Sequence, residues 1–115
     1  MLPERSLPAG FPSLARLREL DLNNNEIKAL PPDLGRASAL EWLDASSNAL
    51  TELPASVTQL RRLQRLHVDG NALAALPEDI GHLAQLQRLT LEQNKVAFLP
   101  ESFALLLGVP RKFRP

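Results

Sequence analysis

The clearest pattern in the chain is a 23-residue repeat of its hydrophobic positions. Three hydrophobic columns keep this interval through four copies: Leu17, Leu40, Leu63 and Leu86; Leu20, Leu43, Leu66 and Leu89; and the Leu-Pro pairs that begin at Leu30, Leu53, Leu76 and Leu99. One polar column keeps it as well: Asn25, Asn48, Asn71 and Asn94. Because no insertion interrupts these columns, they predict four stacked copies of one structural unit.

The spacing inside a copy predicts the local structure of that unit. Leu20 and Leu22 are two positions apart, which is the spacing of side chains on one face of a strand. One strand cannot bury both leucines alone, so we expect successive strands to pair side by side and bury the row. Each column asparagine lies where the chain leaves its strand, and there it can bond backbone groups of its own turn and of the neighbouring copy. The proline after Leu30 favours a short helical or 3₁₀ turn in the return segment.

The order of these positions resembles a known repeat. The first copy reads L-x-x-L-x-L-x-x-N-x-I-x-x-L from Leu17 to Leu30, and the return segments read LPPDLGRA, LPASVTQL and LPEDIGHL. This resembles the leucine-rich-repeat family, in the intracellular 23-residue form of Ras-group-related and bacterial leucine-rich-repeat proteins, over roughly residues 7–107. The resemblance implies an α/β fold, a right-handed solenoid with a parallel sheet on its concave side and short helical or 3₁₀ turns on its convex side. It also implies a non-catalytic module that binds another protein.

The repeat divides the chain into one domain, residues 1–115, with incomplete copies at both ends. The expected parts are a half-repeat at 7–16, repeats at 17–39, 40–62, 63–85 and 86–108, and a tail at 109–115. Under one interpretation the half-repeats fold over the ends and cap them. Under another, the chain is a fragment of a longer array or self-associates through an uncapped end. We expect Phe98 to be a local packing or end-cap residue, and the basic tail with Arg111, Lys112 and Arg114 to be a solvated, frayed terminus.

The strand positions between the leucines are free to serve binding, because the core does not need them. We expect them on the concave face, where neighbours in a column lie about 4.8 Å apart. The candidate partner-binding residues are Glu19, Asp21, Trp42, Asp44, Arg65, His67, Asp69, Arg88 and Glu92. Five of these nine are acidic and two are arginines, so the expected partner surface is basic or mixed in charge.

Trp42 is the expected anchor of this face. It is the one tryptophan of the chain, and we expect it to be largely exposed beside Glu19 and Arg65. Tryptophan and arginine are enriched in binding hot spots. The alternative is that Trp42 covers the gap left by the small side chain of Ala45, which stands in a leucine column.

Other chemistry is weakly encoded. Asp21, Asp44 and His67 form one column that could in principle bind a divalent cation for hydrolysis, but nothing in the pattern demands it. Ser46 or Ser47 with His67 and Asp69 has the composition of a hydrolase triad, yet it lacks a nucleophile elbow and an oxyanion loop. We therefore expect no enzyme activity, no catalytic or metal site and no cofactor.

Charge and composition narrow the partner class. The chain carries 13 Lys+Arg and 13 Asp+Glu residues, which argues against a nucleic-acid partner. It has no cysteine, no apolar run long enough to cross a membrane and no signal-like start, so we expect a cytoplasmic protein without a membrane partner, although export as an effector is compatible with the sequence. The main hypothesis is a protein-recognition module. The alternative is a fragment or targeting arm of a larger leucine-rich-repeat enzyme or bacterial effector.

Overall fold

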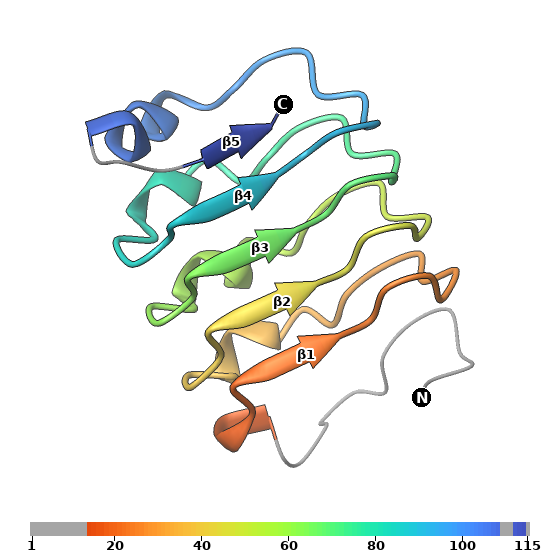
Figure 1. Cartoon of the computed structure of the whole chain (residues 1–115), viewed down its shortest axis with the longest axis vertical. Helices are drawn as coiled ribbons and strands as arrows, with labels where there is room; N and C mark the ends of the chain where they lie inside the picture. The colour runs from red at the N-terminus through yellow and green to blue at the C-terminus, as the bar shows by residue number, and fades with distance from the viewer. Residues whose placement is uncertain (1–13, 109–111, 115) are drawn as a thin grey trace.

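A computed structural model describes residues 14–108 and 112–114 of the chain. In this part of the chain, five short strands form one parallel sheet in the order of the sequence (Figure 1). The strands are β1 (Glu19–Asp21), β2 (Trp42–Asp44), β3 (Arg65–His67), β4 (Arg88–Thr90) and β5 (Lys112–Arg114). Their register aligns the leucine columns, since Leu20 pairs with Leu43, Leu43 with Leu66, and Leu66 with Leu89.

Short 3₁₀ helices return the chain from the end of one strand to the start of the next. They are η1 (Leu14–Arg16), η2 (Leu34–Arg36), η3 (Ala55–Gln59), η4 (Ile80–His82) and η5 (Glu101–Gly108). The helices form a row of their own beside the starts of the strands, towards the left in Figure 1, and neighbouring helices contact one another. The parallel sheet and the 3₁₀ turns confirm the architecture that the 23-residue pattern predicts. Residues 7–13 of the expected N-terminal half-repeat, together with Val109 and Arg111, lie outside the described residues.

The core lies between the sheet and the return segments. The leucine at the centre of each inner strand is completely buried, as Leu43, Leu66 and Leu89 show. The return segments add buried side chains such as Val57 and Ile80. A buried leucine or valine contributes roughly 1.5–3 kcal/mol, and each repeat can bury its row only against the next one. Stacking is therefore the main source of stability.

Asparagine side chains join neighbouring repeats where the strands end. The Asn48 side-chain oxygen accepts hydrogen bonds from the backbone N–H groups of Asn25 and Ile27, at 2.9 Å each. Asn71 and Asn94 likewise donate from their side-chain nitrogens to backbone carbonyls of the preceding repeat. Asn25 donates to a carbonyl of its own turn, two residues earlier. These bonds satisfy backbone groups that the turn leaves without strand partners.

The C-terminal tail differs from the expectation of a frayed end. Lys112–Arg114 forms β5, which pairs in parallel with β4. The register places Phe113 beside Leu89, 24 residues earlier, whereas Leu89 follows Leu66 by 23. The last return segment contains the long helix η5 and is one residue longer than the others. A strict count of 23 residues from Leu89 therefore ends one residue before Phe113, its actual partner.

The fourth repeat also departs from its own pattern on the side where the chain leaves the sheet. Leu76, in the Leu-Pro column, is 5% exposed, whereas Leu99 in the same column is 46% exposed. Phe98 is 85% exposed, so the expectation that it packs locally or caps the end is wrong. In the inner repeats, the next repeat covers the surface of this segment. Within the described part of the chain, no further repeat covers residues 95–100.

Candidate functional site

The solvent-facing side of the sheet carries the candidate binding residues. The central residue of each inner strand points into the core, and the first and third residues point away from it. We call this surface the sheet face. By register, its first column consists of Glu19, Trp42, Arg65 and Arg88, and its second of Asp21, Asp44, His67 and Thr90. The strands thus bring together residues that the sequence separates by a full repeat.

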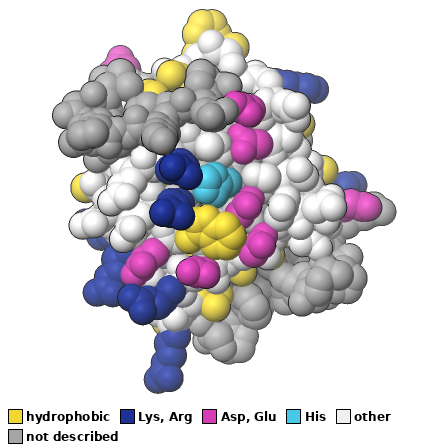
Figure 2. Space-filling view, in the orientation of Figure 1, with side chains coloured by type: hydrophobic (Ala, Val, Ile, Leu, Met, Phe, Trp, Pro, Cys, Tyr) yellow, Lys and Arg dark blue, Asp and Glu magenta, His cyan; other side chains and the backbone are white. Residues whose placement is uncertain are grey.

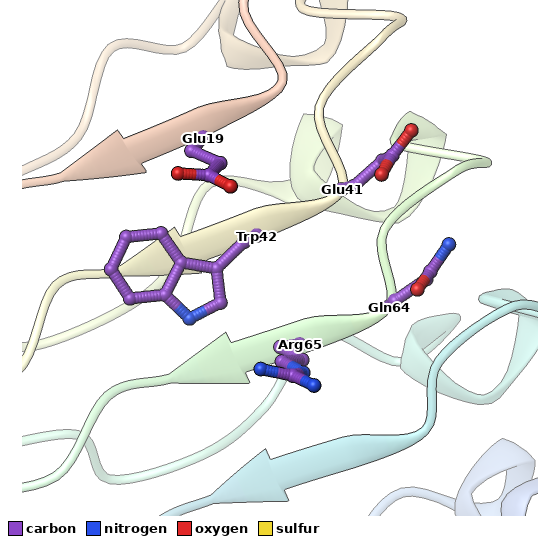
Figure 3. A pocket seen from close by; sticks show the side chains of 5 residues that line it. All are labelled: Glu19, Glu41, Trp42, Gln64 and Arg65. Carbon is purple, nitrogen blue, oxygen red and sulfur yellow. The ribbon is translucent and has the colours of Figure 1, made fainter.

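A shallow open hollow lies over the first column. It has a volume of about 410 Å³ and is lined by Glu19, Glu41, Trp42, Gln64 and Arg65. Figure 3 shows these five side chains. Three of them lie on the neighbouring strands β1, β2 and β3, and Glu41 and Gln64 directly precede β2 and β3. Trp42 from β2 and Arg65 from β3 lie next to each other at its centre. The hollow is too open to exclude water from a reaction, but it offers an aromatic surface flanked by charge.

Trp42 is half-buried, not largely exposed as expected. Its ring meets the imidazole of His67 edge-on, with ring centroids 6.3 Å apart and an angle of 64° between the ring planes. His67 is itself held, because its Nδ1 lies 3.0 Å from the hydroxyl oxygen of Thr90. Ala45, whose gap Trp42 could have covered, is completely buried in the core. The neighbouring strand therefore restricts the indole ring before any partner arrives.

The charges on the sheet face are separated along the first column. Glu19 stands on β1 and Glu41 directly before β2, whereas Arg65 and Arg88 stand on β3 and β4. Within the described residues, neither arginine forms an ion pair. Figure 2 looks onto this face and shows one large hydrophobic side chain beside two basic ones and a histidine, with acidic side chains around them. Along the first column, a ligand therefore meets acidic groups towards β1 and basic groups towards β4, whereas Asp44, Asp69 and Glu92 keep the other side of the face acidic.

Three of the acidic candidates also support the turns that come after the strands. Asp21 and Asp44 each accept a hydrogen bond from the backbone N–H two residues further on, at 3.0 and 2.9 Å. Asp69 accepts one from the backbone N–H of Glu92 in the next repeat, at 2.7 Å. These carboxylates fix the ends of the strands, so part of their hydrogen-bonding capacity is used within the protein. Glu19 supports no turn in this way within the described residues.

The arrangement of His67 and Asp69 does not form a triad. The imidazole Nδ1 of His67 lies against Thr90, and the Asp69 carboxylate is bonded to the next repeat. Among the residues that the structure describes, no group of three or more His, Asp or Glu side chains is placed to hold a metal ion. The column of Asp21, Asp44 and His67 accordingly offers no assembled ligand set.

Two residues of the hollow were missed from the sequence. Glu41 and Gln64 directly precede β2 and β3, one position before the first column. The Glu41 carboxylate also accepts a bond from the Arg18 guanidinium at 3.2 Å, in a surface ion pair with the preceding repeat. The signal was present, because the position after the first leucine is polar in each copy. Counting the strand from one residue earlier would have included both.

A family model described as a leucine-rich repeat region matches residues 9–74, which is more than half of the chain. The chain belongs to the leucine-rich-repeat family. This match confirms the resemblance inferred from the columns of leucine and asparagine.

Two solved structures show the same leucine-rich-repeat fold. A leucine-rich-repeat protein from Leptospira interrogans has 32% sequence identity and a TM-score of 0.76, with 90% of this chain and 32% of that chain covered. An internalin (inlF) from Listeria monocytogenes has 22% identity and a TM-score of 0.54, with 88% and 35% covered. The chain thus spans about a third of the length of each of these proteins. No curated protein is significantly similar to it in sequence.

Membership in the leucine-rich-repeat family sets the general expectation for the sheet face. Repeats of this kind stack into solenoids whose extended surfaces bind other proteins, and they are typically non-catalytic. No helix within the described residues is long and apolar enough to cross a membrane.

Proposed function

We propose that this leucine-rich-repeat domain is a non-catalytic recognition module that binds a protein partner on its sheet face, with Trp42 as the anchor. The observation that carries the proposal is the pairing of Trp42 with Arg65 at the centre of the open hollow. Tryptophan and arginine are the side chains most often found to dominate binding energy. Trp42 stands on a strand and its ring rests against His67, so little conformational entropy is lost when the ring is covered.

The packing of Trp42 supports this role. Because its ring already rests edge-on against His67, the exposed part of the indole is presented in one orientation. A half-buried aromatic ring with a fixed orientation can bury its remaining apolar surface against a partner at low entropic cost. The sheet face is thus prepared to bind a flat apolar or aromatic side chain over β2.

The charge distribution supports a partner of mixed charge. Acidic groups of such a partner would lie over Arg65 and Arg88, which have no ion-pair partner within the described residues. Basic groups would lie towards Glu19. Complementary charges of this kind mainly set the orientation of a partner and its association rate. The count of five acidic candidates predicted a partner surface that is basic or mixed in charge. Of these two, the purely basic surface fits less well because Asp21, Asp44 and Asp69 are partly engaged in turns.

The proposal is tested by selecting peptide or protein binders against the folded domain and comparing variants. Trp42→Ala should weaken the affinity of the selected binders by about 2 kcal/mol, roughly 30-fold, because a central aromatic anchor is lost. Arg65→Ala should weaken it as well. The matched control is Arg61→Ala, which removes an exposed arginine beyond the end of η3, outside the sheet face. Unchanged affinity in Trp42→Ala, with the fold intact by circular dichroism, would show that the anchor is wrong.

A second candidate function is a targeting arm of a larger leucine-rich-repeat enzyme or effector, with the activity encoded outside these residues. It is favoured by the finding that the chain spans only about a third of the two solved proteins it resembles. The length of the natural open reading frame distinguishes the two candidates. An open reading frame that comprises residues 1–115 alone would contradict the targeting-arm candidate, because no residues would remain to carry the activity.

A further inference from the structure

The segment Lys95–Glu101 exposes apolar side chains that the other repeats bury or lack. Phe98 and Leu99 are 85% and 46% exposed, respectively. Leu76, which holds the place of Leu99 one repeat earlier, is almost completely buried, and the place of Phe98 is held there by Ala75. Figure 2 shows hydrophobic side chains at this end of the solenoid, away from the sheet face. Contiguous exposed apolar surface, in contrast to a single exposed residue, is typical of interaction sites.

A hollow of matching size lies directly beside Phe98. It has a volume of about 260 Å³ and is lined by Leu91, Gln93, Asn94, Val96, Ala97 and Leu99. An apolar cavity of about 150 Å³ is sufficient to bind a benzene ring, so this hollow has room for one phenyl group. The protein therefore presents an aromatic knob next to a mostly apolar hole, which residues of this segment line together with Leu91, Gln93 and Asn94.

The charges of the segment are arranged symmetrically about the knob. Lys95 lies three residues before Phe98 and Glu101 three residues after it, and both side chains are exposed. The chain between them, residues 95–100, belongs to neither a helix nor a strand and runs along the edge of the fourth repeat (Figure 1). If two such segments meet in opposite directions with Phe98 at the centre, each Lys95 faces the Glu101 of the other copy. The segment is thus complementary to itself in charge.

We propose that this segment forms a two-fold symmetric contact between two copies of this chain, in which Phe98 of each copy enters the hollow of the other. A surface that carries both a knob and its hole produces a closed dimer when paired by a two-fold axis, because both halves are satisfied at once. The contact shares no residue with the sheet face. The dimer would therefore present two sheet faces, which allows bivalent binding of a partner that carries two epitopes.

The mass of the protein in solution tests this contact. Light scattering across a concentration series should show a reversible dimer for the natural sequence. Phe98→Asp should weaken dimerisation at least tenfold, because a charge cannot enter the apolar hollow. The matched control is Ala75→Asp, which places the same charge at the equivalent exposed position one repeat earlier and should leave the dimer intact. A monomer at every concentration, or a dimer that persists unchanged in Phe98→Asp, would overturn the proposal.

The antiparallel arrangement is tested separately by exchanging charges. Lys95→Glu alone should weaken the dimer by placing two glutamates opposite each other. The double variant Lys95→Glu with Glu101→Lys should restore it, since it only reverses the direction of each pair. Failure of the double variant to recover dimerisation, with both variants folded, would contradict the two-fold geometry. Because these variants leave the sheet face untouched, a failure here is distinguishable from a failure of partner binding.

Discussion

Gly81 lies against the backbone of Ser102 so closely that a Cβ atom at Gly81 would overlap the Ser102 carbonyl oxygen. The Gly81 N–H also donates to the Ser102 hydroxyl at 2.9 Å. The same relationship joins Gly35 to Ser56 two repeats earlier, with an N–H to hydroxyl distance of 3.1 Å. On the convex side, a glycine that approaches a serine therefore joins η2 to η3, and a second such pair joins η4 to η5.

Replacing Gly81 by alanine should destabilise the domain by about 3 kcal/mol, because the added methyl group overlaps backbone atoms that cannot move aside alone. Urea unfolding followed by circular dichroism measures the change. Gly35→Ala is the matched comparison and should cost less. The closest atom to its Cβ is the flexible end of the Gln59 side chain, and the backbone oxygen of Ser56 lies 2.8 Å away, less severely overlapped than the Ser102 backbone at Gly81. Equal stabilities for the two variants would show that the close approach at Gly81 relaxes freely.

The asparagine bonds predict a second stability difference. Asn71→Ala removes side-chain bonds to the carbonyls of Ala45 and Val68 and to the N–H of Leu50. Leaving such partly buried groups unpaired should cost about 2–3 kcal/mol. Asn25→Ala serves as the control, because Asn25 donates one bond within its own turn, and it should cost about 1 kcal/mol. The free energies of unfolding of the two variants in urea give the comparison, and equal losses would show that the bonds between repeats add nothing.

A third prediction concerns the residue before each column asparagine. This position has a positive φ in every described repeat, with values of 63°, 57°, 67° and 60° at Asn24, Ser47, Gly70 and Gln93. Glycine adopts this conformation without strain, so Gly70→Ala should destabilise the domain by about 1 kcal/mol. Gln93→Gly should have the opposite sign, with a gain of about 0.5 kcal/mol. Thermal unfolding of both variants decides the matter, and a loss of stability in Gln93→Gly would show that backbone strain at this position is not the governing factor.

A fourth prediction uses the natural fluorescence of the chain. Because Trp42 is the sole tryptophan of the sequence, the emission spectrum reports the sheet face alone. A partner that covers the hollow should shift the emission maximum to shorter wavelength as water leaves the indole. In His67→Ala the emission band of Trp42 should be broader, because the edge-on contact that orients the ring is lost. An emission spectrum that does not change on binding would place the partner elsewhere.

The repeat fold was predictable because its period is visible in the sequence. Leu20, Leu43, Leu66 and Leu89 define both the strands and their register, so the sheet can be inferred from their spacing. The period fails where a single residue is inserted. Phe113 occupies the strand position of the same column after 24 residues, so a count fixed at 23 treats the last strand as a tail.

The site was predictable in position but not in detail. The columns place Trp42 beside Arg65, which the structure confirms. The columns do not predict that the indole ring turns onto His67, the contact that makes Trp42 half-buried. They also do not show that Asp44 bonds a backbone N–H of its own turn, because such a bond depends on the turn geometry. Likewise, the exposure of Leu99 depends on which segments pack over it in space, and the Leu-Pro motif carries no information on that packing.

The most direct measurement of recognition through the sheet face is an NMR titration of the isotopically labelled domain with a selected protein partner. Binding on this face predicts that the indole N–H signal of Trp42 and the backbone amides of β2, β3 and β4 shift, whereas the amides of η2, η3 and η4 do not. Shifts confined to the 3₁₀ helices, with an unchanged indole signal, would contradict recognition through the sheet face.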